Sequence, residues 1–489
     1  MIQNHSNEQH LVDLIQQLCE LPGETEWVEF KVNHRKPEDI GKYISAMSNV
    51  AALNKRASAY VVWGIEDGTH AIVGTKFSPG TQKKGNEPLE TWLLRLLEPQ
   101  VDFHFYEAVI DNRKVVLLEV GCTTHQPVSF NGEEFVRIGS NTKKLKDHPE
   151  RERQLWRLFE KIPFEDGVAL RHQDGGNVLR LLDYSAYFDL SEQPQPGGND
   201  EVLSALAADG LIQRCDAGKW NITNLGAVLF AKELGDFGRL KRKAMRIIKY
   251  RGTSRIRGAE EIVETMGYAC AFQNMVQSIG GLVPANEVIN EALRERIPIF
   301  PLLAVRELVA NALIHQDFFV TGAGPMVEIF DNRIEITNPG EPLVDTQRFV
   351  DAPPKSRNEK IASLMRRCRI CEERGGGIDK VVAQVEMEQL PAPLFESPSG
   401  FTRTVLFSHK DMKDMDKADR VRACYLHACL KYVDRGYLTN ASLRERFGIE
   451  ERNRVVVSRY IREAVNDGKI KPYDPDSGRK SMKYHPFWA

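Results

Sequence analysis

Apolar and polar residues follow periodic patterns that predict an α/β unit at the start of the chain. Residues 37–53 place Ile40, Ile44 and Met47 on one side of a helix, because apolar residues three or four positions apart share a helical face. Residues 59–65 are an unbroken apolar run that predicts a buried strand closed by a turn. The unit's other predicted elements are helices at 9–20 and 149–161 and strands at 27–32, 103–110, 114–120 and 134–138.

Three further units follow from the same kind of pattern. A small helical or winged-helix connector is predicted first, and an α/β unit with strands at 246–250, 325–330, 333–338 and 401–407 follows it. The mixed-charge run at 409–420 predicts a hinge or a helix start. We therefore expect an α/β and α+β multidomain protein whose four domains cover residues 1–165, 166–235, 236–410 and 411–489.

Composition describes an ordinary globular protein. A chain of 489 residues is too long to fold around a single hydrophobic core. Its content of 42% hydrophobic and 27% charged residues is typical of neither a disordered nor a fibrous chain. The formal net charge of −2 means that any nucleic-acid footprint must be local. Among the eight cysteines only Cys368 and Cys371 have the spacing of metal ligands, and no second such pair completes a four-cysteine zinc site. We therefore expect the cysteines to be reduced thiols. With no signal-like N-terminus and no apolar run of about 18 residues, we expect a soluble cytoplasmic protein.

Residues 306–317, RELVANALIHQD, carry the most informative polar pattern. Glu307, Asn311 and His315 are spaced i, i+4 and i+8, so a helix places them on one face. Burying unpaired polar groups costs a few kcal/mol, and a magnesium-nucleotide complex would offset that cost. Carboxamide oxygen suits Mg²⁺, and a carboxylate four residues earlier can activate water. Taken alone, the pattern also fits a polar stripe that faces solvent.

Three downstream segments make a nucleotide site the better interpretation. Residues 331–343 predict a strand that ends in a sharp Asn-Pro-Gly turn, and the basic segment 355–365 follows it. Next, residues 373–381 place a glycine triplet at the start of a helix. Glycines there let backbone N–H groups approach phosphates at a helix N-terminus.

In this order the four segments resemble the GHKL-type ATPase domain in its divergent RecG-C-terminal-like form, as found in Schlafen AlbA-type bacterial proteins. The resemblance covers about 180 residues of this chain and implies ATP and Mg²⁺ as cofactors. It differs from the usual pattern at Asn338, where GHKL proteins carry an adenine-binding Asp, so nucleotide selectivity is open. The implied roles are Glu307 as general base, Asn311 as Mg²⁺ ligand, His315, Asn338 and Gly340 at the nucleotide, Gly375, Gly376 and Gly377 at the phosphates, and Arg357 and Asn358 in a lid-like segment.

Residues 21–161 resemble the Schlafen AlbA-type domain, through GETEWVEFKVN, AYVVWGIEDGTHAIVG and FVRIGSNTKKL. Ala51 and Ala52 replace the family's usual Gly-Gly, so we expect a differently shaped loop there. In some Schlafens this domain is a metal-dependent RNase with three carboxylates, which hold ions that activate water. The matching residues are Glu24, Glu29 and Asp67, with Lys31 beside them, while Lys31, Arg137, Lys143 and Lys144 are the predicted nucleic-acid contacts. Alternatively, Glu29 and Lys31 simply pair.

The last 70 residues have the helix, turn, helix and hairpin order of a winged helix. From Thr439 onward the chain has eleven Lys and Arg residues and seven Asp and Glu residues, which gives a local net charge of +4. This excess favours DNA or RNA binding, although winged helices also bind proteins. The ending resembles the tail common in the same bacterial family. The predicted contacts are Arg452, Asn453, Arg459 and Arg462 on the second helix and Arg479, Lys480 and Lys483 on the wing.

Together these expectations predict a regulatory or defence-type protein in which ATP binding rearranges nucleic-acid-binding domains. The alternatives are a Schlafen-like nuclease gated by the ATPase domain, and a transcription regulator with a degenerate nucleotide site. No G-x-x-x-x-G-K-[ST] phosphate loop is present, which argues against a helicase motor. A homo-oligomer is implied by the resemblance alone.

Overall fold

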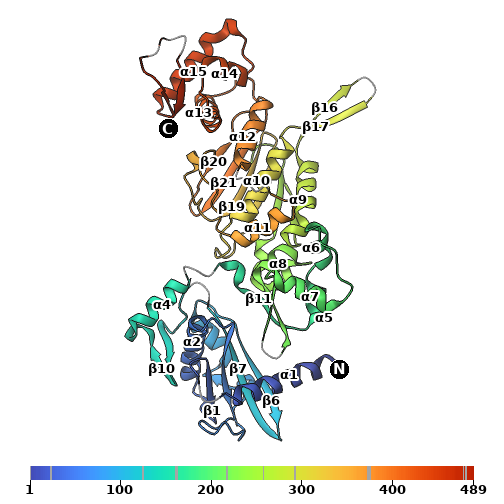
Figure 1. The fold of residues 1–489 in the computed structure, drawn as a ribbon, viewed down its shortest axis with the longest axis vertical. Helices are drawn as coiled ribbons and strands as arrows, with labels where there is room; N and C mark the ends of the chain where they lie inside the picture. Colours follow the sequence, from blue (N-terminus) through green and yellow to red (C-terminus); the bar gives the residue numbers. More distant parts are fainter. Residues whose placement is uncertain are drawn as a thin grey trace. The chain divides into compact units, whose positions relative to one another are not determined.

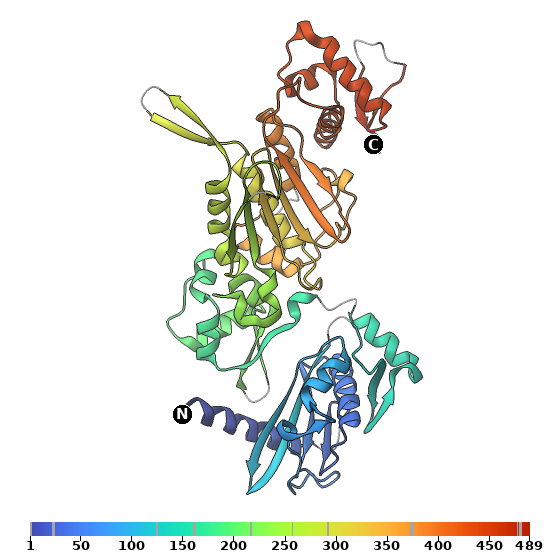
Figure 2. The same ribbon diagram turned by 180° about the vertical axis from the view of Figure 1, so that it is seen from behind.

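The computed structural model describes residues 2–21, 25–123, 126–159, 163–215, 218–256, 258–290, 293–371, 376–476, 478 and 482–489. They form two compact units, Met1–His172 with Arg214–Asn221, and Gln173–Gln213 with Ile222–Ala489. Both units mix helices and sheets, which confirms the predicted fold class (Figures 1 and 2). The predicted division into four domains stays a prediction.

The first unit is an α/β domain built on a four-stranded sheet of order β1-β2-β7-β6, with β1 and β2 parallel. Helix α2 covers one face of this sheet and also contacts the second sheet, β10-β9-β8-β5, while α1 packs on the other face. The elements are α1 (Ile2–Cys19), β1 (Val28–Lys31), α2 (Pro37–Leu53), β2 (Ser58–Trp63), β3 (Lys83–Lys84), β4 (Glu87–Pro88), α3 (Leu89–Leu96), β5 (Leu97–Glu98), β6 (Phe103–Ile110), β7 (Arg113–Gly121), β8 (Ser129–Phe130), β9 (Glu133–Ile138), β10 (Asn141–Lys144) and α4 (Pro149–Phe159).

Buried polar side chains of α2 fix the helix between the two sheets. The Asn49 amide donates to the carbonyls of Val128 at 3.0 Å and Phe135 at 2.8 Å, and its oxygen accepts from the N–H of Val128 at 2.7 Å. Ala51 and Ala52, where a differently shaped loop was expected, are buried inside α2. Alanine, a strong helix former, lets the helix continue there.

The chain crosses between the units through β11 (Val168–Gln173), β12 (Ile212–Arg214) and β13 (Trp220–Thr223). The second unit has a six-stranded sheet of order β15-β14-β18-β19-β21-β20, in which β14 and β18 are parallel and the other pairs are antiparallel. Helix α10 packs against α9, α12 and β19. The elements up to β21 are α5 (Gly175–Leu181), α6 (Tyr184–Leu190), α7 (Asn199–Ala208), α8 (Asn224–Phe230), β14 (Met245–Tyr250), β15 (Ala259–Glu264), α9 (Tyr268–Leu282), β16 (Ala285–Asn290), β17 (Leu293–Pro298), α10 (Leu302–His315), β18 (Met326–Ile329), β19 (Arg333–Pro339), α11 (Glu359–Arg367), α12 (Gly377–Met387), β20 (Leu394–Glu396) and β21 (Phe401–Phe407).

The C-terminal part of the second unit contains three helices and a short hairpin in the order predicted for a winged helix. Its core includes Val382 of α12 and Val350 from the segment before α11, so these residues join it to the sheet domain. The assignment as a winged helix stays a prediction. The elements are α13 (Lys417–Val433), α14 (Asn440–Arg446), α15 (Arg454–Asn466), β22 (Ile470–Pro472) and β23 (Tyr484–Pro486).

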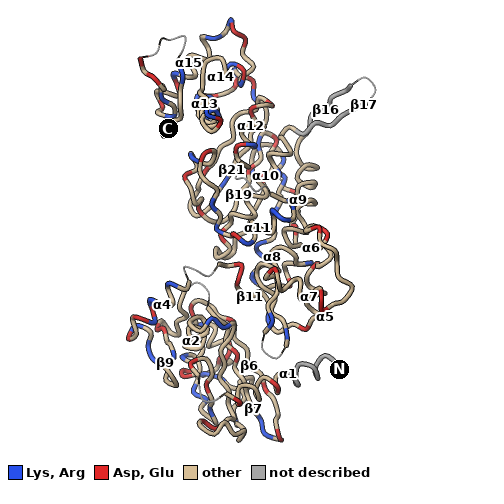
Figure 3. Tube along the Cα trace, viewed as in Figure 1, with Lys and Arg blue, Asp and Glu red and all other residues tan. Residues whose placement is uncertain are grey.

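Two general properties follow from the described residues. Basic and acidic side chains are interspersed along both units (Figure 3), in keeping with the net charge of −2. Within the described parts of the chain, every helix is too short or too polar to span a lipid bilayer.

Candidate functional site

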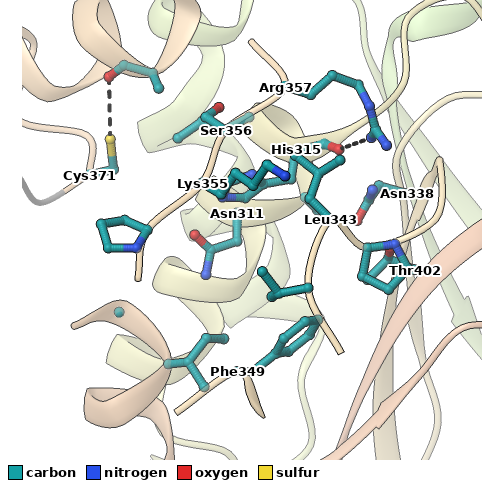
Figure 4. Close-up of a pocket in the computed structure, with 18 of the residues that line it drawn as sticks. Asn311, His315, Asn338, Leu343, Phe349, Lys355, Ser356, Arg357, Cys371 and Thr402 are labelled. Carbon is teal, nitrogen blue, oxygen red and sulfur yellow. Dashed lines mark hydrogen bonds between the residues drawn. The ribbon is translucent and has the colours of Figure 1, made fainter. Parts of the chain in front are cut away.

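The second unit contains a cavity of about 540 Å³ between α10, the end of β19, β21 and the segment that leads into α11. Polar and charged lining residues come from α10 and from the segment before α11, which carries Lys355, Ser356 and Arg357, and apolar residues such as Leu343 and Phe349 also line the cavity (Figure 4). The lining residues that matter below are Glu307, Asn311, His315, Ile336, Asn338, Leu343, Phe349, Lys355, Ser356, Arg357, Arg366, Cys371, Gly377, Thr402 and Thr404.

Helix α10 brings Glu307, Asn311 and His315 to the same cavity, as their spacing predicted. From Ala304 onward its other residues are mostly buried Leu, Val and Ala, which fixes the polar row toward the cavity. Glu307 is 3% exposed, and one of its oxygens lies 3.0 Å from Nη1 of Arg306. The Asn311 side chain points into the cavity (Figure 4), and its amide has no hydrogen-bond partner among the described residues.

His315 is neutral at pH 7. Burial, with a smaller effect of the Arg357 cation, lowers its pKa to about 4. Arg357 in turn donates to the carbonyl of His315 and to the carbonyl of Glu341, both at 3.0 Å. Arg357 therefore lines the cavity and also fastens the end of α10.

Asn358, predicted to contact the nucleotide from a lid, does not line the cavity. It is 2% exposed, and its amide donates to the carbonyls of Ile314 at 2.7 Å and Gln316 at 2.8 Å. These carbonyls belong to the last turn of α10 and the residue after it, where a helix leaves backbone acceptors unpaired. The side chain caps α10, and the prediction of a ligand contact was wrong for the described conformation.

Asn338 and Gly340 lie at the end of β19 but differ in role. Asn338 lines the cavity and is 5% exposed, and its amide nitrogen donates to the carbonyl of Pro339 at 3.1 Å. Gly340 is not a lining residue. Its φ of +100° suits glycine, and a Cβ there would lie 2.7 Å from Nη1 of Arg357 and 2.8 Å from the Cβ of Asp317. Gly340 thus permits close packing behind the cavity.

The predicted glycine triplet reaches the cavity through Gly377, the first residue of α12. A Cβ at Gly377 would lie 3.2 Å from Oε2 of Glu307 and 3.8 Å from Nδ2 of Asn311. Gly376 has open space where its Cβ would be and does not line the cavity. Gly375 lies outside the described residues. The helix N-terminus therefore faces the two key side chains of α10.

Several lining residues were absent from the predicted site. Lys355 and Arg366 bring positive charge to the cavity, and Phe349 brings an aromatic ring. Thr402 and Thr404 alternate along β21, and alternate residues of a strand share a face. That period-two pattern was the signal that could have identified the two threonines.

The predicted nuclease residues of the first unit are arranged differently. Glu29 is 3% exposed and is ion-paired with both Lys31 and the fully buried guanidinium of Arg137. The alternative in which Glu29 and Lys31 pair thus agrees with the geometry. Arg137 was expected to contact phosphate, and its burial contradicts that expectation, because a phosphate cannot reach a side chain with 0% exposure.

The other first-unit candidates lie at the surface or outside the described residues. Asp67 is exposed in the turn after β2, and Glu24 lies outside the described residues. Lys143 is exposed, and Lys144 is 2.6 Å from Oε1 of Glu133. Among the described side chains, no three His, Cys, Asp or Glu residues come together in a way that could hold a metal ion.

The predicted contacts on the second helix of the C-terminal unit are all exposed on α15 or just before it. Arg452 lies 2.5 Å from Glu450, and Arg459 lies 4.0 Å from Glu463, while Asn453 immediately precedes the helix and its side chain makes no capping hydrogen bond. Arg462 and Lys483 are exposed as well, and Lys483 lies over the ring of Tyr437. Arg479 and Lys480 lie outside the described residues.

Comparisons with known proteins match two parts of the chain. Residues 24–146 match the family described as "Schlafen, AlbA_2", and residues 322–406 match "Putative ATP-dependent DNA helicase recG C-terminal". No curated protein matches. One solved structure, the DIP2311 protein from Corynebacterium diphtheriae, is 14% identical, with 99% of this chain and 100% of that chain covered, at a TM-score of 0.38. The chain thus carries a Schlafen AlbA_2 domain and a RecG C-terminal-like ATPase domain.

Proposed function

We propose that the cavity beside α10 binds ATP with Mg²⁺ and that its occupancy controls nucleic-acid binding by the C-terminal helices. The observation that carries this proposal is the Asn311 amide, which has no partner among the described residues and points into a cavity beside buried Glu307 and the start of α12. Because Asn311 is only partly buried, its amide is open to a ligand that enters the cavity. The ATPase-like match begins just after this helix.

The lining residues fit a magnesium-nucleotide complex in size and chemistry. A cavity of about 540 Å³ lies within the range of about 300–1,000 Å³ that small-molecule sites occupy. The oxygen of Asn311 is a suitable magnesium ligand, and Lys355 and Arg366 supply positive charge for phosphates. Ile336 and Leu343 supply apolar surface for a base. Magnesium bound with the nucleotide would offset phosphate charge and polarise the terminal phosphorus–oxygen bonds.

Hydrolysis would require a base, and Glu307 is the residue placed for it. Its carboxylate lies beside the Gly377 end of α12 and on the same helix face as Asn311. We infer that Glu307 would accept a proton from an attacking water, while Arg306, 3.0 Å away, holds the carboxylate in place.

The segment 341–357 links the cavity to the C-terminal helices, which gives the second half of the proposal a physical route. The Tyr425 hydroxyl of α13 donates to the carbonyl of Gln347 in this segment. The Arg348 guanidinium lies 4.0 Å from the ring centroid of Trp488. Other residues of the segment line the cavity. A ligand that moves one side of this segment must therefore disturb contacts on the other side.

Helix α12 supplies a second link. Its first residue, Gly377, faces the cavity, and near its other end Glu386 accepts from Nδ1 of His427 at 2.9 Å. The Nε2 atom of His427 is 3.0 Å from the hydroxyl of Ser442 in α14. Arg446, also in α14, lies 3.4 Å from Glu386. Helix α12 thus connects the ligand side of the domain with α13 and α14, and the helix with the exposed arginines, α15, packs against both.

Nucleotide binding is tested by calorimetric titration of the full-length protein with ATP and Mg²⁺. We expect Asn311→Ala to weaken ATP affinity by about tenfold to a hundredfold, since it removes a metal ligand and a polar contact. Asn141→Ala is the matched control, because Asn141 is exposed on β10 of the other unit. Unchanged affinity in Asn311→Ala would refute the site.

Control of nucleic-acid binding is tested separately by fluorescence anisotropy with labelled DNA and RNA, with and without a non-hydrolysable ATP analogue. Tyr425→Phe removes the hydrogen bond to Gln347, so we expect the analogue's effect on affinity to shrink by about fivefold, the equivalent of about 1 kcal/mol. Tyr184→Phe on α6 is the control. No effect of the analogue on wild-type affinity would refute the coupling while leaving nucleotide binding intact.

The nuclease alternative receives no support from the first unit. Glu29, the central carboxylate of the predicted trio, is already paired with Arg137 and Lys31. A carboxylate neutralised in this way is poorly suited to hold a divalent cation.

A further inference from the structure

The first unit contains a thiol, an imidazole and a carboxylate in one line of contacts, away from the cavity described above. The Cys215 sulfur lies 3.6 Å from Nδ1 of His172, and Nε2 of the same ring lies 2.8 Å from Oε1 of Glu119. Glu119 is 2% exposed, whereas Cys215 is partly exposed. This order of groups is the one that activates a cysteine nucleophile, with the ring between a thiol and an orienting acceptor.

The surroundings of Glu119 hold the imidazole in its protonated form. Burial opposes ionisation of both partners, but the hydrogen bond and charge of His172, with Arg171 and Ser58, lower the Glu119 pKa to about 2. Burial likewise opposes the charged ring of His172, and the contacts with Cys215 and Glu119 raise its pKa to about 9. At neutral pH both ring nitrogens therefore carry protons, and the Nδ1 proton faces the sulfur.

Backbone geometry fixes the ring in this position. His172 has a φ of +52°, a conformation that non-glycine residues rarely adopt. Its N–H donates to the side-chain oxygen of Asn221 at 3.0 Å, and Asn221 is 3% exposed. The N–H of Cys215 donates to the carbonyl of Lys219 at 2.9 Å, which helps to hold the backbone of Cys215 in place.

The other seven cysteines of the chain lie in a different environment. Burial raises the pKa of each of these thiols, which keeps them protonated and unreactive at neutral pH. They are Cys19, Cys122, Cys270, Cys368, Cys371, Cys424 and Cys429. Cys215, by contrast, lies with its sulfur beside the His172 ring.

We propose that Cys215 is a reactive nucleophile, a site of covalent S-modification by small soft electrophiles, activated by His172 and positioned through Glu119. The imidazolium stabilises the thiolate by donating from Nδ1 to the sulfur, and the carboxylate keeps the ring oriented and charged. With iodoacetamide as the probe, the thiolate attacks the methylene carbon, a sulfur–carbon bond forms, and the carbon–iodine bond breaks to release iodide. The proton stays on His172.

Other charged groups face this line from neighbouring elements and enter any pH profile. Arg171 lies 3.9 Å from Oε1 of Glu119, and Tyr106 on β6 has its pKa raised to about 12 by burial and by the Glu119 charge. Arg214 at the end of β12 and Lys219 are close to Cys215 in the chain. Tyr106 keeps its proton between about pH 6 and pH 8.5, so its own ionisation does not contribute to the profile in this interval.

The experiment measures the rate at which iodoacetamide alkylates each cysteine of the folded full-length protein, by mass spectrometry of its peptides. We expect Cys215 to react fastest of the eight, and faster in wild type than in His172→Asn throughout about pH 6.5 to 8.5. In His172→Asn the rate should rise steadily with pH, as for an ordinary thiol of pKa about 8.5. At about pH 6 wild type should exceed this variant by about tenfold, since the gain in thiolate outweighs its lower nucleophilicity.

Two comparisons keep the proposal falsifiable if a variant folds poorly. Cys19, also partly exposed, serves as an internal reference within wild type and needs no substitution. Glu119→Gln keeps the shape of the carboxyl group while removing its charge, and should move the pH profile toward that of His172→Asn. Wild-type Cys215 reacting no faster than Cys19, or no faster than Cys215 in His172→Asn, would overturn the proposal.

Discussion

Replacing Arg137 by methionine should destabilise the first unit strongly, because the guanidinium is the buried partner of a buried carboxylate. Arg137 is 0% exposed and Glu29 is 3% exposed. Removing one partner of such a pair costs about 3–5 kcal/mol. Lys31 remains beside Glu29 and is 24% exposed at its side chain, so we expect a loss at the lower end, about 3 kcal/mol.

Hydrogen exchange measured by mass spectrometry suits this test, because it reports the opening of individual segments in the full-length protein. A loss of about 3 kcal/mol corresponds to about a hundredfold lower protection of the amides in β1, β2 and β9. Arg137→Lys retains the charge and should lose less. In the double variant Glu29→Gln with Arg137→Met, part of the loss should return, since no buried charge is left unpaired. A loss below about 1 kcal/mol in Arg137→Met would refute the reasoning.

Three further predictions concern the cavity, the histidine and the C-terminal helices. Gly377→Ala places a Cβ 3.2 Å from Glu307 and should weaken ATP affinity in calorimetry by about tenfold. Gly376→Ala has open space around its Cβ and should leave the affinity unchanged. Equal effects of the two substitutions would contradict this prediction. The His172 pKa is raised to about 9 in the folded protein. The protonated ring therefore contributes its full stabilisation of the fold below the pKa of about 6.5 that histidine has in the unfolded chain. This contribution is lost as the pH rises through about 9. Urea unfolding should therefore show wild type losing more stability than Glu119→Gln over that interval, and parallel curves would contradict it. Arg462→Ala should reduce the salt dependence of DNA or RNA binding by about one unit of slope, and an unchanged slope would remove Arg462 from the interface.

Elements with strong local patterns could be predicted from the sequence, and elements that depend on packing could not. The helix at 37–53 and the strand at 103–110 have the predicted bounds, because their apolar residues repeat with a clear period. Helix α9 was not predicted, and Gly280 and Gly281 near its end weaken the helical signal in its sequence. It is held by tertiary contacts instead, such as the buried Tyr268 hydroxyl, which donates to the carbonyl of Lys243 at 2.6 Å.

The same division applies to the candidate site. The row from Glu307 to His315 was visible in the sequence because all its members lie on one helix. The capping role of Asn358 was not, because its acceptors lie more than 40 residues away in the chain. The pairing of Arg137 with Glu29 also joins distant strands. Sequence spacing reports neighbours within one element, whereas contacts between elements are set by the fold.

The most direct test of the central claim is hydrogen exchange of the full-length protein with and without a non-hydrolysable ATP analogue and Mg²⁺. We predict slower exchange in α10, in the segment 341–357 and at the start of α12, and slower exchange in α13 as a consequence of its contact with that segment. Asn311→Ala should abolish these changes. Protection that appears elsewhere, or that persists unchanged in Asn311→Ala, would contradict the assignment of the nucleotide to this cavity.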